Sequence, residues 1–399
     1  MTASQPSVGL SGWFRLVSAT FTAVIVGFAS TILVVMEASR SVGASPAEQA
    51  SWAASLCFGM AATSFILSWR YRMPMITAWS TPGAVLIATS GGGISYANAL
   101  GAFVVAGLLM VVAGLIKPLE RAIEKIPAPI AAAMLAGVLL RYTLGVPGAA
   151  MAMPLAVLPL IAVFFALRMS FPLYAVPVVV AAGVAGAFLS GSLAGDCCDF
   201  GLTALVWTTP QFDVQTVLSV GVPLFLVTMA SQNLPGFAVL RASGYQPPVQ
   251  PALIVTGAAS AALAPFGSHA VNMAAITAAI VTGPDCHPDP AKRWLVAWPY
   301  LVFYGLIGLM AASFVNILGA LPKDLVTAIA GLALFSPLMG GVSAMMKDPR
   351  DVESALVTFL VTASGLTIMG VGSAFWGLVA GLMLFGARHL RDSSRAGSG

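Results

Sequence analysis

Long apolar stretches follow one another along almost the whole chain, and only short polar connections separate them. A helix of about 20 apolar residues can cross a lipid bilayer. We count fourteen such segments, of which the third and tenth are short and interrupted: 14–37, 50–69, 73–90, 94–116, 127–146, 150–168, 172–190, 214–240, 248–264, 265–283, 294–318, 324–346, 352–371 and 373–390. Only 8% of the 399 residues are charged, too few to solvate the surface of a soluble domain. The sequence therefore predicts an all-α polytopic membrane protein. We expect no cleavable signal peptide, because residues 1–12 are polar.

The basic residues give an independent test of this segment count. If the amino terminus is cytoplasmic and the segments alternate, only Arg40, Arg141 and Lys323 of the 18 lysines and arginines lie outside. Cytoplasmic connections of membrane proteins carry an excess of these residues. A miscount by one segment would scramble the bias. The distribution therefore supports fourteen segments with both termini in the cytoplasm.

The two interrupted segments occupy matching positions in the two halves of the chain. Fourteen segments divide into seven plus seven, so the second half would be inverted relative to the first, as in many secondary transporters. In segment 3 we expect Thr81 to be the N-cap of a half-helix with Pro82 at its first position. Segments 1 and 8 also resemble one another, ASTILVVMEASRSVG in Ala29–Gly43 against ASQNLPGFAVLRASG in Ala230–Gly244. Pairs of interrupted segments are the best sequence indication of a transporter's binding site.

Segment 10, PFGSHAVNMAAITAAIVTG, predicts an extended lead-in followed by a half-helix that opens inside the bilayer. It begins with the helix breakers Pro265 and Gly267, continues with Ser268, His269 and Asn272, and only then becomes an apolar helical run. About 10 to 12 helical residues are too few to cross the hydrocarbon core. Broken helices at membrane depth are tolerated where they are buried in protein or line a cavity. We therefore expect a substrate site here, with the half-helix starting near Val271.

His269 is the main candidate for proton coupling. Thirteen of the 14 acidic residues fall in predicted connections, termini or flanks, and Glu37 alone lies within a segment, at its outer end. An ionisable side chain at membrane depth costs about 2.5–3.5 kcal/mol and is a functional candidate by default. Histidine can change charge near physiological pH. Two alternatives stay open: Glu37 as a proton relay, and a neutral His269 that holds the broken segment through a backbone hydrogen bond.

Segment 8 carries Ser231, Gln232 and Asn233 in the middle of an otherwise apolar helix. Buried amides need hydrogen-bond partners, and contacts between helices are the alternative to a site role. We favour the site because segments 8 and 10 are indicated independently. Ser30 and Thr31 of segment 1 lie at the equivalent position, but small hydroxyl residues are common in membrane helices.

The ligand implied by these features is a small anion. Two half-helix amino ends facing each other would offer unpaired N–H groups and partial positive charge, and such ends bind anions without a lysine or arginine. Phe21, Phe28, Trp79 and Phe266 suit a ligand with an apolar body. The four cysteines show neither metal-ligand spacing nor a disulfide framework, and we find no nucleophile–base pair or phosphate loop. We expect no catalytic residue, metal, cofactor or nucleic-acid partner, and so no enzyme.

Three blocks of the sequence resemble the bacterial benzoate membrane transport family, the benzoate:proton symporters. They are VTMASQNLPGFAVLRASGY (Val227–Tyr245), the segment Pro265–Gly283, and PDCHPDPAKRW (Pro284–Trp294). The resemblance covers most of the chain. It implies the fold of nucleobase permeases and of sulfate- and bicarbonate-type anion transporters. In that fold segments 3 and 10 each join a short strand to a half-helix, segments 1–4 and 8–11 form a core domain, and segments 5–7 and 12–14 form a gate domain.

The resemblance divides the predicted segments into core and gate domains and gives site residues for this chain. Seven polar residues carried over by position would bind the substrate, with His269 also coupling the proton: Gln232, Asn233, Ser268, His269, Asn272, Ser80 and Thr81. Ser30 and Thr31 join this set through the likeness of segments 1 and 8. The expected units are core segments 1–4 with gate segment 5 in 14–146, gate segments 6 and 7 in 147–190, a periplasmic linker in 191–213, core segments 8–11 in 214–318, gate segments 12–14 in 319–390 and a cytoplasmic tail in 391–399.

The expected function is import of benzoate or a similar aromatic carboxylate with a proton across the bacterial cytoplasmic (inner) membrane. Nucleobase permeases carry glutamates in segments 8 and 10 where this chain has amide, serine and histidine, which disfavours a nucleobase. A related nucleobase or inorganic-anion transporter and an anion channel are the alternatives. The expected partners are the carboxylate, the proton and the lipid bilayer, and a homodimer is left open.

Overall fold

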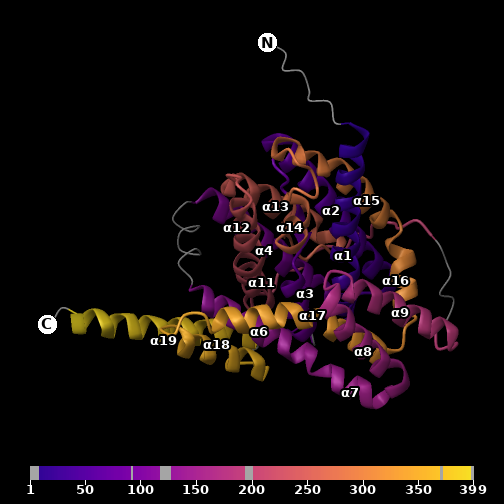
Figure 1. Cartoon of the computed structure of the whole chain (residues 1–399). Helices are drawn as coiled ribbons and strands as arrows, with labels where there is room; N and C mark the ends of the chain where they lie inside the picture. The colour runs from indigo at the N-terminus through magenta and orange to yellow at the C-terminus, as the bar shows by residue number, and fades with distance from the viewer. Residues whose placement is uncertain (1–8, 91–92, 117–126, 194–200, 369–371, 397–399) are drawn as a thin grey trace, which may run out of the picture.

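The computed structural model describes residues 9–90, 93–116, 127–193, 201–368 and 372–396, and the backbone alone for the last seven of these. The chain is helical over most of this length (Figure 1). The helices of the first half are α1 (Leu10–Ser41), α2 (Pro46–Tyr71), α3 (Thr81–Ser90), α4 (Tyr96–Leu115), α6 (Ala128–Thr143), α7 (Gly145–Ala152), α8 (Pro154–Ser170) and α9 (Ala175–Leu189). Strand β1 (Thr77–Trp79) precedes α3.

The second half begins with a long helix that contains two π-helical turns. Its parts are α10 (Val214–Thr216), the π-helix η1 (Val217–Gly221), α11 (Val222–Thr228), the π-helix η2 (Met229–Asn233) and α12 (Leu234–Ala242). The elements that follow are α13 (Val249–Leu263), the 3₁₀-helix η3 (Ala264–Phe266), strand β2 (Val271–Met273), α14 (Ile276–Thr282), the 3₁₀-helix η4 (Pro290–Val296), α15 (Ala297–Leu309), α16 (Ala311–Gly319), α17 (Lys323–Met345), α18 (Val352–Ser364) and α19 (Ser373–Ala396).

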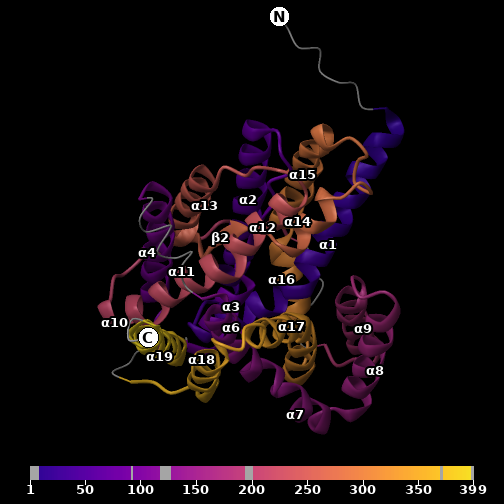
Figure 2. The same cartoon turned by 60° about the vertical axis from the view of Figure 1, so that its left-hand side comes forward.

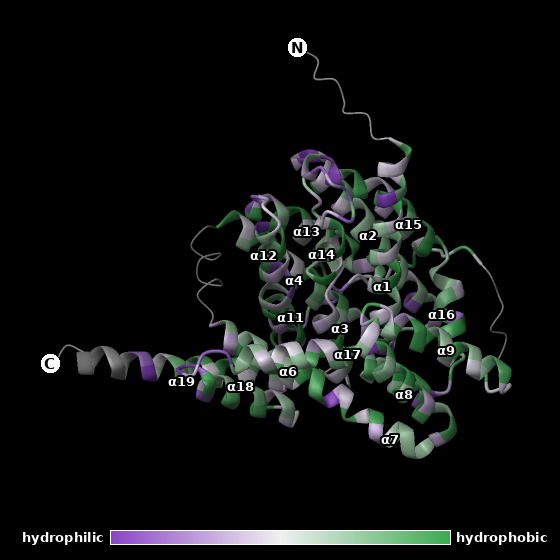
Figure 3. Ribbon diagram, viewed as in Figure 1, coloured by the Kyte–Doolittle hydropathy of each residue, from purple (hydrophilic) through white to green (hydrophobic). Residues whose placement is uncertain are grey.

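The predicted membrane class is confirmed. Among the described residues, seven helical stretches are long and apolar enough to cross a bilayer, and η4–α15 with α16 form a bent pair that adds an eighth if it counts as one span. Hydrophobic residues cover most of the helices, and hydrophilic residues gather in connections at the top of the view (Figure 3). Each predicted segment contains a helix, but several of these helices are short. The count of fourteen and the inverted repeat therefore stay predictions.

The helices form two groups in space. α6–α9 and α17–α19 lie together in the lower part of the view, and α1–α4 with α11–α15 fill the upper part (Figures 1 and 2). Within the upper group α4 and α13 cross closely at two glycines. A Cβ atom on Gly107 would come 2.6 Å from the backbone nitrogen of Ala261, and one on Gly257 would come 2.8 Å from the Gly107 carbonyl oxygen. Small residues at membrane helix crossings allow this approach, which fixes α13 and the strand that follows it.

The two broken segments meet as a two-stranded antiparallel sheet in the upper group. Thr77 pairs with Met273, Ala78 with Asn272 and Trp79 with Val271. β2 lies among α2, α11, α12 and α13 (Figure 2). The partner strand and neighbouring side chains together satisfy the backbone groups of both strands, which is required of non-helical backbone at membrane depth.

Two details of the predicted half-helices are wrong. The second begins at Ile276, not near Val271, because residues 271–273 are used in strand pairing. The N-cap of α3 is Ser80, not Thr81: the Ser80 Oγ accepts a hydrogen bond from Gly83 N at 3.1 Å, and its carbonyl accepts from Ala84 N at 2.8 Å. α14 is only seven residues long, so its dipole is weaker than the prediction assumed.

Candidate functional site

The β1–β2 sheet is supported from behind by hydroxyl groups of α2 and α15. The Thr77 Oγ1 lies 2.8 Å from the hydroxyl oxygens of both Thr63 and Ser64. Tyr300 donates its phenolic hydrogen to the Thr77 carbonyl at 2.6 Å. Because these groups are buried, their hydrogen bonds hold the sheet against α2 rather than facing a ligand.

His269 lies two residues before β2 and links three separate parts of the chain. Its Nδ1 accepts a hydrogen bond from Trp52 Nε1 at 3.0 Å, and its Nε2 lies 2.9 Å from the Ser80 carbonyl oxygen. An indole N–H can only donate, so Nδ1 carries no hydrogen and Nε2 donates to Ser80. The ring is fully buried beside Trp52 and Phe103. In this conformation His269 is a neutral bridge between α2, β1 and β2.

This geometry sets a condition on the predicted role of His269 in proton coupling. A second ring proton would have to be placed on Nδ1, where the Trp52 N–H now points. Protonation therefore requires the Trp52 hydrogen bond to break first. The coupling role stays a prediction, and it requires this hydrogen bond to break.

Ser80 and the two buried asparagines complete the connections around the sheet. The Ser80 hydroxyl oxygen accepts a hydrogen bond from Thr228 Oγ1 at 2.9 Å, which joins α11 to α3. Asn272, with its amide oxygen turned towards β1, accepts from Ser80 N at 3.0 Å. The Asn233 Oδ1 accepts from Met273 N at 2.9 Å, which joins η2 to the end of β2. These predicted site residues are brought together, but their polar atoms are used on one another.

The π-helix η2 contains all three polar residues predicted in segment 8. Pro235 has no N–H to donate to the Ser231 carbonyl, and its ring would collide with that carbonyl in a regular helix. The backbone widens into a π-turn, a feature that occurs often at functional sites. Ser231 bonds back to the Val227 carbonyl. Sequence reasoning missed this turn, although a proline two residues beyond each π-helix, Pro223 and Pro235, was a visible signal.

Gln232 and Thr81 are the predicted site residues with polar groups left for a ligand. Both are partly exposed, and neither side chain has a hydrogen-bond partner among the residues that the structure describes. Thr81 is the first residue of α3, directly after the Ser80 cap. Gln232 lies four residues beyond Thr228, which donates a hydrogen bond to the Ser80 cap of α3.

The other predicted residues differ in their surroundings. Ser30 and Thr31 are partly exposed and bond to the Gly27 carbonyl within α1, and Thr31 also accepts from Trp79 Nε1 at 2.8 Å. Ser268 is fully buried, and its hydroxyl has no partner in the described part of the chain. It therefore reaches no ligand in this conformation.

Aromatic rings adjoin this end of α3 on one side. Phe28 lies between Trp79 and Phe314, with ring centroids at 5.8 and 5.1 Å. Phe21 and Phe266 are not part of this cluster, since they pack on Phe303 and Trp207. We use the name α3 site for five residues near this end of α3: Thr81, Gln232, Thr31, Phe28 and Trp79. The site combines hydroxyl and amide groups with an apolar wall.

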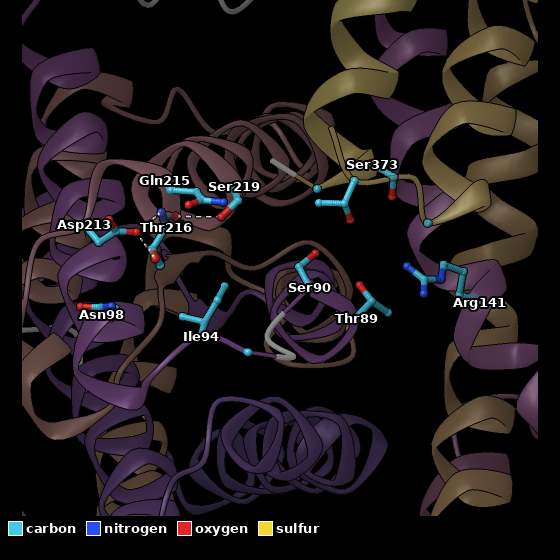
Figure 4. Close-up of a pocket in the computed structure, with 14 residues that line it drawn as sticks. Thr89, Ser90, Ile94, Asn98, Arg141, Asp213, Gln215, Thr216, Ser219 and Ser373 are labelled. Atoms are coloured by element: carbon cyan, nitrogen blue, oxygen red, sulfur yellow. Dashed lines mark hydrogen bonds between the residues drawn. The ribbon is translucent and has the colours of Figure 1, made fainter. Parts of the chain in front are cut away.

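Two cavities lie near the ends of the half-helices. One, of about 610 Å³, lies beside the start of α1 and along α14, between Arg15 and Asp285. The other, of about 420 Å³, lies at the far end of α3 beside Ser90 (Figure 4). No group of three or more potential metal ligands was found among the described residues.

Comparisons with known proteins decide the family. The sequence profile of the family described as "Benzoate membrane transport protein" (BenE) matches residues 14–386. The chain belongs to this family. A curated relative, "Benzoate membrane transport protein" of Acinetobacter baylyi, is 32% identical over 92% of this chain and 93% of its own length. "Inner membrane protein YdcO" of Escherichia coli is 39% identical over 91% of this chain and 93% of its own length.

Solved structures of anion transporters share the fold. The transmembrane domain of the cyanobacterial bicarbonate transporter BicA matches 94% of this chain and 98% of its own, with a TM-score of 0.60 and 14% identity. The murine anion transporter Slc26a9 in its inward-facing state matches 98% of this chain and 74% of its own, with a TM-score of 0.61 and 12% identity. The predicted family is thus confirmed, and the protein is a membrane transporter rather than an enzyme.

Proposed function

We propose that this transporter imports benzoate, or a close aromatic carboxylate, together with a proton across the bacterial inner membrane. The observation that carries the proposal is the α3 site. Its free donors are the Gln232 amide and the Thr81 hydroxyl, and Phe28 and Trp79 form its apolar wall. A carboxylate is an acceptor for such donors, and an aromatic body suits the wall. Membership of the benzoate transport family and the name of the Acinetobacter relative support the same substrate.

The amino end of α3 supplies the favourable charge at this site. Helix amino ends carry about half a positive charge and unpaired N–H groups. The Gly83 N–H donates to the Ser80 hydroxyl oxygen, the Ala84 N–H donates to the Ser80 carbonyl oxygen, and Pro82 has no N–H. The Thr81 N–H therefore remains available for an anion. Because α14 has only seven residues, the proposal depends on α3 and η2 rather than on two opposed dipoles.

For transport, we propose that the upper helix group is the core domain and that the group α6–α9 with α17–α19 is the gate, with both termini cytoplasmic. The bound carboxylate and the proton would together leave the core domain without net added charge, and the core would then move against the gate. The proton would be carried by His269 or shared between the substrate and the site. The relative named as an inner membrane protein supports the location. No step of this proposal requires a homodimer.

The test is uptake of radiolabelled benzoate into proteoliposomes under an imposed pH gradient. Accumulation above the external concentration, abolished by a protonophore, is expected of a proton symporter. A channel would equilibrate benzoate without concentrating it. Competition by uracil or sulfate but not by salicylate would refute an aromatic carboxylate as substrate.

Substitutions in the α3 site test whether benzoate binds there. Gln232→Leu removes a hydrogen bond to a charged ligand, worth about 1.5–3 kcal/mol, so KM should rise about ten- to hundredfold. Gln250→Leu, the same change at the start of α13 and away from the site, is the control and should leave KM unchanged. Equal KM values for both variants would place the substrate elsewhere.

A further inference from the structure

The cavity at the carboxyl end of α3, here called the Arg141 cavity, is separate from the α3 site. Ser90 lines it, whereas Thr81 marks the α3 site nine residues earlier. At 1.5 Å per residue the two lie about 13 Å apart along α3. A volume of about 420 Å³ is within the range of roughly 300–1,000 Å³ typical of small-molecule sites.

The lining of this cavity is mostly polar and uncharged. Hydroxyl and amide side chains surround it, with one cation and one acid: Thr89, Ser90, Asn98, Gln215, Thr216, Ser219, Thr367 and Ser373, with Arg141 and Asp213. Figure 4 places Arg141 on one side, with its guanidinium directed towards Thr89 and Ser90, and Asp213 on the opposite side.

The two charged groups differ in what they are free to do. Asp213 caps α10, with its Oδ2 accepting from Thr216 N at 2.8 Å and from Thr216 Oγ1 at 2.7 Å. These hydrogen bonds lower the pKa of its carboxyl group. Arg141 has no hydrogen bond or ion pair with any residue that the structure describes. Its five donors therefore remain available inside a polar cavity.

The chain is shaped to let Arg141 reach this position. Gly365 ends α18 with φ 70°, and a Cβ atom there would lie 2.9 Å from the Arg141 Cζ. Glycine suits the left-handed turn, and its missing side chain leaves room for the guanidinium. The negative carboxyl ends of α18 and α3 would repel an anion here. The positive charge of Arg141 is therefore what makes the cavity suitable for an anion.

The cavity also lies where the two helix groups meet. On one side, Arg141 belongs to α6, Gly365 to the connection after α18, and Ser373 to the start of α19. On the other side, Ser90 belongs to α3 and Ser219 to η1. In the predicted topology these positions are all at outer ends of segments.

We propose that the Arg141 cavity is an outer capture site that binds the carboxylate of the substrate before it reaches the α3 site. This rests on the proposed function, because the captured anion is the transported one. Arg141, on the gate, attracts the carboxylate to the end of α3. The positive end of the same helix then favours its passage to Thr81.

The experiment measures initial rates of benzoate uptake as a function of external benzoate and ionic strength. Clefts that focus charge raise association rates by about 10- to 1,000-fold, so Arg141→Gln should raise KM about tenfold or more at low salt. Its maximal rate should stay within about twofold, and the KM should lose its salt dependence. Arg141→Lys should restore most of the affinity. Lys323→Gln removes an equally exposed charge at the start of α17, outside the cavity lining, and should leave KM unchanged.

A labelling measurement covers the case in which Arg141→Gln fails to assemble. Ser90→Cys should react with a membrane-impermeant, negatively charged thiol reagent added outside, above the background of the unsubstituted protein. Benzoate should slow this reaction, and the neutral analogue benzamide should not. Unchanged KM and salt dependence in Arg141→Gln, or labelling that benzoate leaves unaffected, would overturn the capture site. Failure of the unsubstituted protein to accumulate benzoate would instead overturn the proposed function.

Discussion

The His269 bridge can be tested by two substitutions that separate structure from proton transfer. His269→Leu removes both ring hydrogen bonds and leaves the buried Trp52 N–H without a partner, whereas the Ser80 carbonyl still accepts from Ala84 N. An orphaned buried group costs about 1–3 kcal/mol, so the variant should destabilise the protein by about this amount. His269→Gln keeps one acceptor and one donor in the side chain but cannot titrate.

The assays are thermal unfolding in detergent and benzoate uptake in proteoliposomes. His269→Leu should lower the unfolding midpoint strongly, and His269→Gln should stay close to the unsubstituted protein. If His269 carries the proton, the Gln variant should exchange benzoate across the membrane but fail to accumulate it under a pH gradient. An unchanged midpoint in His269→Leu would refute the bridge. Normal proton-driven accumulation by His269→Gln would exclude the histidine as carrier.

Three further predictions concern packing, burial and the sheet. Gly107→Ala should destabilise the protein by about 1–3 kcal/mol, because the new Cβ would lie 2.6 Å from the backbone of α13. Gly186→Ala in α9 is the control, because no atom lies within 4 Å of the new Cβ, and it should be neutral or stabilising by about 0.5–1 kcal/mol. Thermal unfolding of both variants tests the close crossing of α4 and α13. Equal unfolding midpoints would contradict this crossing. Burial raises the pKa of the Cys286 thiol to about 12, so the reactive thiolate is almost absent at about pH 8. N-ethylmaleimide followed by mass spectrometry should find Cys286 unmodified until the protein is unfolded, and rapid native labelling would disprove its burial. Asn233→Leu leaves the Met273 N–H unpaired, at a cost of about 1–3 kcal/mol; hydrogen exchange at Met273 should accelerate, and unchanged protection would show that η2 does not hold β2.

The fold was largely predictable because bilayer physics restricts the alternatives. Long apolar runs must be helices in lipid, and the interruptions at residues 73–90 and 265–283 were visible as proline, glycine and polar residues. The strands came from the family resemblance. Their pairing joins residues nearly 200 positions apart, and no local pattern specifies such a contact.

The candidate site was predicted less completely. The sequence correctly grouped Ser80, His269 and Asn272, which lie together in the structure. It did not reveal that these groups bond mainly to protein, because Trp52 lies 217 residues away from His269. The choice of Thr81 as cap was wrong by one residue, since two adjacent hydroxyl side chains give the same local signal. Arg141 was assigned only to the outer side of the membrane, because the cavity around it is built from parts that are distant in sequence.

The short sheet also has a consequence for how the protein is made. β1 is synthesised and inserted long before β2, because β2 lies about 200 residues further along the chain. Until then, the N–H and C=O groups of β1 have no strand partner, and each unpaired group costs several kcal/mol in a hydrocarbon environment. The first half of the chain is therefore expected to remain incompletely folded in the bilayer, shielded by water or by the insertion machinery. The α3 site would be completed only when Val271–Met273 arrives, so truncation before this strand should yield inserted but proteolysis-sensitive protein.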